Sequence, residues 1–249
     1  MLLNKELLEA DAAKEDTVAV RFNGARGRRQ EASILSNATV LFRGAALTYS
    51  YLMASTVPLV VGDNLVAGAS PGIVIGNDAL VRFTLGGDAS TDRLFLAPAN
   101  CWPASDIVVP VVYRKRGPVL EQNVSVKGRL LRDALVDTGS GYDLLVYDDR
   151  RFDQLVEAGH EVVQYAHVSG VSDGVELQSV SVRVAGIQVM ANVVYSREED
   201  APNGITSLLG APILMAQGFS VRKIDENTGE LRLAADWTDV QCADSSTTR

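Results

Sequence analysis

The residue types best suited to chemistry lie in one short run, Asp137-Thr138-Gly139-Ser140. The run follows Leu135-Val136, and an apolar pair before Asp and Gly is typical of a buried strand that ends in a turn. A carboxylate held on such a turn can act as a general base toward a water molecule. A second element, Leu208-Leu209-Gly210, also places a glycine after two apolar residues. We interpret Asp137 as the candidate catalytic residue.

Together, the two elements resemble those of pepsin-like and retroviral (retropepsin-like) aspartic proteases, whose pattern is two apolar residues, Asp, Thr or Ser, and Gly. In that family two Asp side chains, one from each lobe or subunit, hold a water between them. They share one proton, because like charges about 3 Å apart cannot both ionise. The resemblance implies an endopeptidase that needs no metal and no cofactor, and the sequence offers no cluster with metal-ligand spacing.

The resemblance also assigns roles to the residues of the turn. Thr138 would direct its hydroxyl across the two-fold axis and lock two active-site turns together. Gly139 would let the backbone bend so that its N–H approaches the carboxylate of Asp137. Ser140 would hydrogen-bond the outer carboxylate oxygen. In an alternative that stays open, Asp137 only caps a turn and Ser140 satisfies its carboxylate.

Two further elements would support the site. The resemblance implies that Leu208, Leu209 and Gly210 pack beneath the active-site loop and that a short helix begins at Ala211. A mobile flap would lie at residues 167–174, because its glycines suit the tip of a β-hairpin. The flap candidates are Ser169, Gly170 and Gly174.

An internal repeat indicates duplication. The runs 73–80 and 207–214 share an apolar-apolar-Gly pattern, and each is followed by a phenylalanine, a turn and an alternating Leu-x-Leu triplet (94–96 and 231–233). Such matching periods predict two similar lobes. Alternating strands such as 18–22, which end at the turn signal Asn23-Gly24, make the class all-β. The resemblance implies that each lobe is a retropepsin-like closed β-barrel, with a degenerate first lobe.

The expected boundaries follow from this repeat. Residues 1–16 form an N-terminal helix or arm, and residues 17–98 form the degenerate lobe. Residues 99–106 are a linker, residues 107–236 are the catalytic lobe, and residues 237–249 are a polar tail. Trp102 and Trp237 follow the ends of the two repeats, where they are expected to act as packing plugs.

The source of the second carboxylate is the main question. The best match in the first lobe is Ile34-Leu35-Ser36-Asn37-Ala38-Thr39, which puts Asn37 where an Asp is needed. An amide cannot take up or release the shared proton. Either two copies of the 107–236 lobe form a homodimer with two Asp137 side chains, or the first lobe holds the partner position and the chain is a weak or inactive enzyme. The second hypothesis makes the protein a scaffold or binding protein.

Composition narrows the partners and the compartment. The net charge of −8 argues against nucleic-acid binding. Cys101 and Cys242 are the only cysteines, and two lone cysteines offer neither metal-ligand spacing nor a disulfide framework, so a reducing compartment is expected. Charge at Lys5 and Glu6 comes too early for a signal peptide, and the apolar runs are too short to cross a bilayer. We therefore expect an intracellular, cytoplasmic protein with a peptide or protein substrate. The family implies processing of a viral or mobile-element polyprotein.

Overall fold

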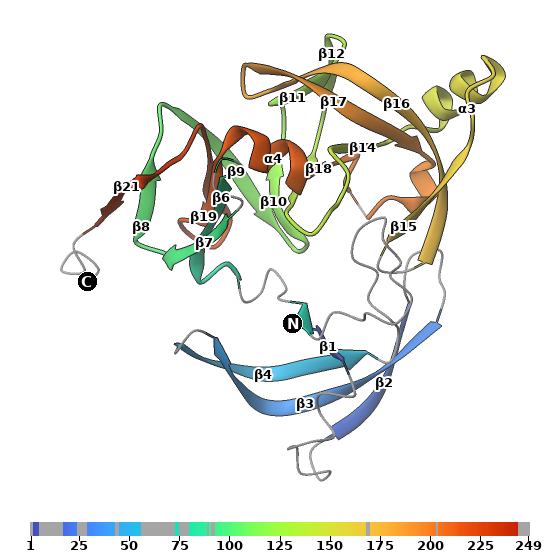
Figure 1. Cartoon of the computed structure of the whole chain (residues 1–249). Helices are drawn as coiled ribbons and strands as arrows, with labels where there is room; N and C mark the ends of the chain where they lie inside the picture. The colour runs from blue at the N-terminus through green and yellow to red at the C-terminus, as the bar shows by residue number, and fades with distance from the viewer. Residues whose placement is uncertain are drawn as a thin grey trace. The chain divides into compact units, whose positions relative to one another are not determined.

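The computed structural model describes residues 2–4, 17–23, 29–42, 45–55, 73–74, 80–88, 90, 93–167, 170–202 and 204–243. Side chains are described only from Leu80 onward. The chain divides into two compact units. Unit 1 comprises Met1–Ala79 with Ala166–Gly170, and unit 2 comprises Leu80–Tyr165 with Val171–Arg249. Figure 1 shows the elements of both units.

Strands dominate the described residues, which confirms the all-β class. Two α-helices accompany them, α3 (Asp149–Glu157) and α4 (Ala211–Gln217), together with the 3-10 helix η3 (Glu198–Asp200). The described strands follow open paths from edge to edge, so no closed barrel is formed among them.

Unit 1 contains one five-stranded sheet in the order β2-β3-β4-β1-β5. Its strands are β1 (Leu2–Asn4), β2 (Thr17–Asn23), β3 (Arg29–Phe42), β4 (Ala45–Ser55) and β5 (Ile73–Val74). The alternating strand predicted at 18–22 lies within β2, which ends at the expected Asn23. The predicted N-terminal helix is wrong at residues 2–4, which pair with β4 and β5, and residues 5–16 lie outside the described residues.

Unit 2 contains most of the large sheet, which runs β12-β11-β16-β17-β14-β18-β13-β10-β9-β20-β19-β6-β7, with β15 paired to β16. Its first strands are β6 (Phe83–Asp88), β7 (Arg93–Pro98), β8 (Cys101–Ala104), β9 (Ile107–Arg114), β10 (Gly117–Leu120), β11 (Val124–Val126), β12 (Arg129–Leu131) and β13 (Ala134–Asp137). The later strands are β14 (Leu144–Tyr147), β15 (Val163–His167), β16 (Gly170–Val184), β17 (Ile187–Ser196), β18 (Ser207–Gly210), β19 (Phe219–Lys223), β20 (Thr228–Leu233) and β21 (Asp236–Cys242).

The two ends of the chain repeat the same strand pairing. β1 lies parallel to β4 and antiparallel to β5, and β14 lies parallel to β17 and antiparallel to β18. β3 pairs with β2 and β4, as β16 pairs with β15 and β17. Antiparallel hairpins follow, β6–β7 and β19–β20. We call β1–β8 repeat A, β14–β21 repeat B, and the strands β9–β13 between them the central segment.

The two repeats meet at a symmetric strand pair. β6 and β19 both begin with phenylalanine and pair antiparallel, with Leu85 opposite Val221. Each of these residues is the third in its strand, so equivalent positions of the two repeats face each other. This register is what a local two-fold axis between the two strands produces. The hairpins therefore preserve the duplication that the sequence indicates.

Strand β8 and strand β21 cross over to the opposite repeat. Trp237 of β21 stacks on Phe95 of β7, with ring centroids 4.7 Å apart, and its indole N–H donates to the carbonyl of Phe219 at 3.1 Å. The guanidinium carbon of Arg222 lies over the ring of Trp102 in β8, 3.7 Å from the ring centroid. Both tryptophans therefore pack as their positions predicted.

A disulfide joins Cys101 of β8 to Cys242 of β21. The expectation that the two cysteines offer no disulfide framework is thus wrong, because the antiparallel pairing of β8 and β21 brings these distant residues together. The structure also corrects three of the predicted boundaries. Residues 101–104 of the predicted linker and residues 237–242 of the predicted polar tail are strand, and residues 80–98 belong to unit 2 and not to the first lobe.

Candidate active site

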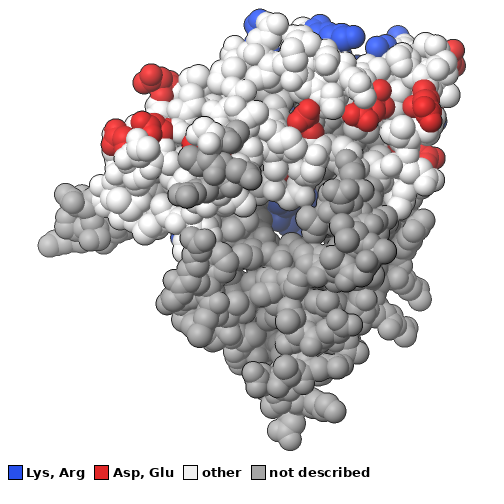
Figure 2. Space-filling model, viewed as in Figure 1, with Lys and Arg blue, Asp and Glu red and all other residues white. Residues whose placement is uncertain are grey.

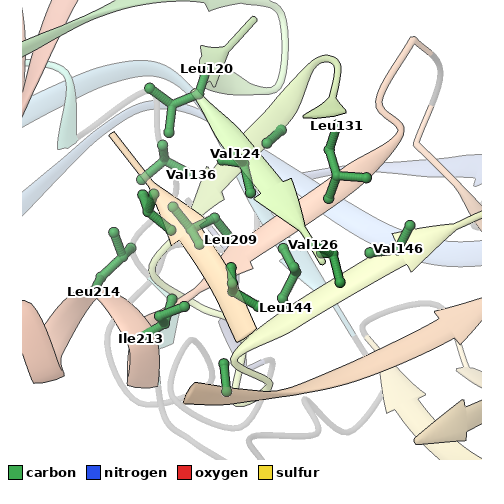
Figure 3. Packing of buried hydrophobic residues seen from close by; sticks show 14 of the residues in the cluster. Leu120, Val124, Val126, Leu131, Val136, Leu144, Val146, Leu209, Ile213 and Leu214 are labelled. Atoms are coloured by element: carbon green, nitrogen blue, oxygen red, sulfur yellow. The ribbon is translucent and has the colours of Figure 1, made fainter. Parts of the chain in front are cut away.

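Asp137 is the last residue of β13, which lies next to the enclosed strand β18. β18 lies between β13 and β14, parallel to β13 and antiparallel to β14. In this ladder Val136 pairs with Leu209, and Leu209 pairs with Leu144. Figure 3 shows these three side chains in the core, with Ile213 and Leu214 of α4 close by. Burial of apolar side chains on both faces accounts for the unbroken apolar runs in the sequence.

The chain turns sharply as soon as β13 leaves the core. The N–H of Ser140 donates to the carbonyl of Asp137 at 3.1 Å, which closes the turn. The N–H of Gly139 donates to Oδ1 of the Asp137 carboxylate at 3.0 Å. A Cβ at Gly139 would lie 3.3 Å from that oxygen, so a side chain there would crowd the carboxylate. Thr138 lies between Asp137 and Gly139 in the turn and is half-buried.

Burial raises the pKa of Asp137 above its ordinary value, and the backbone N–H groups of Gly139 and Ser140 lower it without cancelling that effect. Desolvation disfavours the charged carboxylate, whereas hydrogen bonds to the charged form favour it. A carboxyl with a raised pKa retains its proton to higher pH than an exposed Asp. Such a group is suited to sharing a proton with a second acid.

The role expected for Ser140 is not the one found. Its hydroxyl oxygen accepts the N–H of Tyr142 at 3.3 Å, and its backbone N–H, not its hydroxyl, acts on Asp137. The hydroxyl therefore shapes the loop that follows the turn. A serine hydroxyl next to a turn can bond to either group, and the sequence did not distinguish the two.

Gly210 fixes the position of that loop. Its N–H donates to the carbonyl of Asp143 at 2.9 Å, and the next N–H, of Ala211, donates to the carbonyl of Ser140 at 3.0 Å. A Cβ on Gly210 would lie 1.7 Å from the carbonyl oxygen of Tyr142, which no packing can accommodate. α4 then begins at Ala211. The loop after Asp137 is thus laid directly against the end of β18.

Two residues of this loop were missed by the sequence analysis. The Asp143 carboxylate accepts the N–H of Asn192 in β17 at 2.8 Å, which ties the loop to a second strand. Tyr142 packs edge-to-face against Tyr165, with ring centroids 5.8 Å apart. Neither residue belongs to a recognisable motif, so no signal in the sequence marked them.

The flap candidates fall in different places. Gly174 lies inside β16 opposite Ser196, where a Cβ would come within 2.7 Å of a Val194 methyl and 3.1 Å of the Tyr165 ring. It is therefore a packing glycine and not the tip of a hairpin. Gly170 is the first residue of β16 and belongs to unit 1. Ser169 lies outside the described residues.

Asn37 does not occupy a position equivalent to Asp137. It lies within the continuous strand β3, between Ser36 and Ala38, which pair with Tyr51 and Tyr49 of β4. By its pairing β3 corresponds to β16, whereas Asp137 ends β13. The alignment of 34–39 with the catalytic run was wrong, because a few apolar positions cannot distinguish one strand from another.

Surface charge and comparison with known proteins add little to this site. Figure 2 shows Asp and Glu side chains in small separate groups on the described part of the visible face, with Lys and Arg along its upper edge. Within the described ranges, no helix is long and apolar enough to span a membrane. No protein-family model matches the chain, and no curated protein matches its sequence.

Proposed function

We propose that this chain is an aspartic endopeptidase in which Asp137 is one of two catalytic carboxyl groups. The observation that carries the proposal is the arrangement of β13, β18 and β14 around Asp137. The central strand ends in Gly210, and the carboxylate accepts a backbone N–H from its own glycine turn. This arrangement is stronger support than the motif alone, since a simple turn cap would not need the fitted contact between Gly210 and the loop.

The proposed reaction uses a water molecule as the nucleophile. The ionised member of the carboxyl pair removes a proton from water as the oxygen attacks the peptide carbonyl carbon. The protonated member donates its proton to the carbonyl oxygen, giving a tetrahedral intermediate. Collapse of the intermediate breaks the C–N bond, and the amine leaves with a proton from the pair. The raised pKa of Asp137 supports its part in this exchange.

The resemblance to retropepsin-like enzymes adds a substrate class. Substrates would bind as extended segments, with alternate side chains in separate pockets. Processing of a viral or mobile-element polyprotein is the biological setting that this class suggests.

The direct test is cleavage of a diverse peptide pool between about pH 4 and 7, with Asp137→Asn as the matched variant. We expect the wild-type chain to cleave and the variant to lose at least about 100-fold in rate, because an amide cannot transfer the proton. Activity that rises more steeply than protein concentration would show that a second copy supplies the other carboxylate. Unchanged cleavage by Asp137→Asn would overturn the assignment of the residue.

The second candidate function is a non-catalytic scaffold or binding protein. The observation that favours it is that the sequence contains a single Asp-Thr-Gly run and that Asn37 does not substitute for a second one. Folded wild-type protein that cleaves nothing, even at high concentration, would favour this alternative.

A further inference from the structure

Strand β21 is held to the rest of unit 2 at only a few points. Among the described strands it forms a two-stranded sheet with β8, and the register of that pairing shifts between Asp236 and Val240. Six of its seven residues are exposed, and Trp237 is the exception. A strand that buries so little of its own surface owes its position to specific contacts at its two ends.

The first of these contacts is a socket for the Trp237 side chain. A Cβ on Gly86 of β6 would lie 2.0 Å from Cζ2 of Trp237, so the indole occupies the space that a side chain at residue 86 would take. Phe95 of β7 stacks on the indole, and the carbonyl of Phe219 in β19 accepts its N–H. The socket is therefore built from β6, β7 and β19, and the Trp237 of another copy would fit it equally well.

The other contacts lie at the far end of β21. The side-chain amide of Asn100 donates to the carbonyl of Ala243 at 2.9 Å, and the N–H of Ala243 donates to the backbone carbonyl of Asn100 at 2.8 Å. Beside them Cys242 forms the disulfide with Cys101 of β8. The hydrogen bonds can be remade with another copy, so the disulfide is the contact that ties β21 to the β8 of its own chain.

The link between β20 and β21 is two residues long, and its backbone is strained. β20 ends at Leu233 and β21 begins at Asp236. Between them Ala234 has a φ of 51°, a left-handed conformation that is unfavourable for a residue with a Cβ. The N–H of Ala234 donates to the carbonyl of Gln217 at 3.1 Å, which holds the bend. An extended Ala234 would relieve the strain and carry β21 away from its own β8, and short strained hinges of this kind favour exchange of the element that follows.

We propose that β21 exchanges between two copies of this chain, and that the Cys101–Cys242 disulfide prevents the exchange until it is reduced. In the exchanged dimer, β21 of each copy pairs with β8 of the other, and each Trp237 fills the socket of the other copy. The same residues make the same contacts, and only the bend at Ala234 is lost. Exchange of an identical element is a low-cost route to a dimer for this reason. The docking surface is thus β8 with the socket, and its partner is a second copy of the chain.

The covalent step is a thiol–disulfide exchange. A dithiol reductant supplies two electrons and two protons, which break the S–S bond and leave Cys101 and Cys242 as thiols, while the reductant itself becomes a disulfide. A small-molecule disulfide reverses the reaction and is reduced to two thiols. The bond then re-forms within one chain or between two, and a bond between two chains is a covalent record of the exchange.

The test uses two variants of the whole chain, Cys101→Ser and Cys242→Ser, which keep one cysteine each. They are mixed at high concentration under a dithiol reductant, diluted, and re-oxidised with oxidised glutathione. A bond between Cys101 and Cys242 can then form only between two different chains. Cys101 is 7% exposed, so this bond requires β21 of one variant to take its place beside β8 of the other. We expect the digested sample to contain the linked Cys101–Cys242 peptides in about tenfold or greater excess over like-with-like pairs, because buried thiols react poorly with random partners.

Two hinge substitutions, each placed in both single-cysteine chains, are the matched controls. Ala234→Gly adopts the left-handed conformation without strain, so we expect it to lower the yield of linked peptides by about tenfold. Ala234→Pro cannot adopt a φ of 51° and lacks the N–H that bonds Gln217, so it should raise the yield. Trp237→Ala leaves the socket empty and should lower the yield without changing the hinge. Circular dichroism establishes that each variant is folded, and Ala234→Gly carries the comparison with the unsubstituted hinge if Ala234→Pro does not fold.

Every outcome bears on the exchange. A yield of linked peptides that changes with the hinge in this order supports it. Absence of linked peptides from folded, reduced mixtures at every concentration would overturn it, since β21 would then stay with its own β8 or leave without a partner. A yield that Ala234→Gly leaves unchanged would also overturn it, because the hinge would not control the association. No cleavage is measured, so the result is independent of the proposed enzyme.

Discussion

Among single residues, Asp137 is one whose charged form is destabilised by burial, and its hydrogen bonds offset that effect only in part. Burial raises its pKa above the ordinary value of 3.8, and two backbone N–H groups oppose that shift. The folded protein therefore binds a proton over a pH range in which the unfolded chain has already lost it. The free energy of unfolding decreases as pH rises through this range, and the loss persists at neutral pH.

The first prediction concerns this loss. Asp137→Asn removes the buried charge, so we expect the variant to have a higher free energy of unfolding than the wild type at pH 7. Well below pH 3.8 the wild-type carboxyl is protonated and the two proteins should be equally stable. Urea unfolding at about pH 2 and at pH 7 measures both differences. A variant that is less stable at pH 7 would show that the hydrogen bonds to the carboxylate outweigh its desolvation.

The second prediction separates two glycines of the site. Gly210→Ala places a methyl group 1.7 Å from the Tyr142 carbonyl oxygen, and we expect it to lower the free energy of unfolding by about 3 kcal/mol. A methyl group at Gly139 would contact only the Asp137 carboxylate, at 3.3 Å. Gly139→Ala should therefore lower the free energy of unfolding less than Gly210→Ala does, and should lower the cleavage rate more. Chemical unfolding of both variants, with cleavage rates alongside, tests the contrast. Equal stability losses would contradict the fitted contact at Gly210.

At the scale of elements, the hairpin β19–β20 is held together by charge as well as by its ladder. Arg222 and Arg232 each donate from Nε to Oε1 of Glu230 at 2.7 Å, and all three side chains are 12–14% exposed. Burial alone would raise the pKa of Glu230, but the hydrogen bonds from Arg232 and Arg222 outweigh it and the pKa lies below its ordinary value. The group therefore stabilises the fold above pH 4.5, and that stabilisation is lost as pH falls through the folded pKa.

The third prediction tests this triad. Glu230→Gln leaves two guanidinium groups together without their carboxylate. We expect a loss of about 2–3 kcal/mol at pH 7, somewhat below the about 3–5 kcal/mol of a fully buried pair. The loss should shrink in acid, where wild-type Glu230 also becomes neutral. Thermal unfolding at pH 7 and pH 3 measures this, and a pH-independent loss would point to packing as its source.

At the scale of the whole molecule, one disulfide ties the last strand of repeat A to the last strand of repeat B. It spans 141 residues of sequence and links β8 to β21. Cross-linking a loop of this length restricts the unfolded chain strongly.

The fourth prediction is that reduction lowers the free energy of unfolding by about 2–5 kcal/mol. Thermal unfolding with and without a thiol reductant measures the effect. The variant with Cys101→Ser and Cys242→Ser is the control, and it should already unfold at the lower temperature and not respond to the reductant. Equal stability of the oxidised and reduced wild type would mean that the packing of Trp102 against Arg222 and of Trp237 against Phe95 suffices to hold the two strands.

Short-range patterns in the sequence are enough to predict the local features of this protein. The all-β class, the strand ending at Asn23 and the two similar hairpins follow from short-range patterns, because period-two alternation and turn residues act within a few positions. Asp137 was identified for the same reason, since its turn and its strand are contiguous. The tertiary structure decided what depends on pairing between distant strands. It placed β18 between β13 and β14, joined Cys101 to Cys242, and assigned Asn37 to the strand equivalent to β16. Such pairings are fixed by register and burial over the whole sheet, and no short stretch of sequence carries that information.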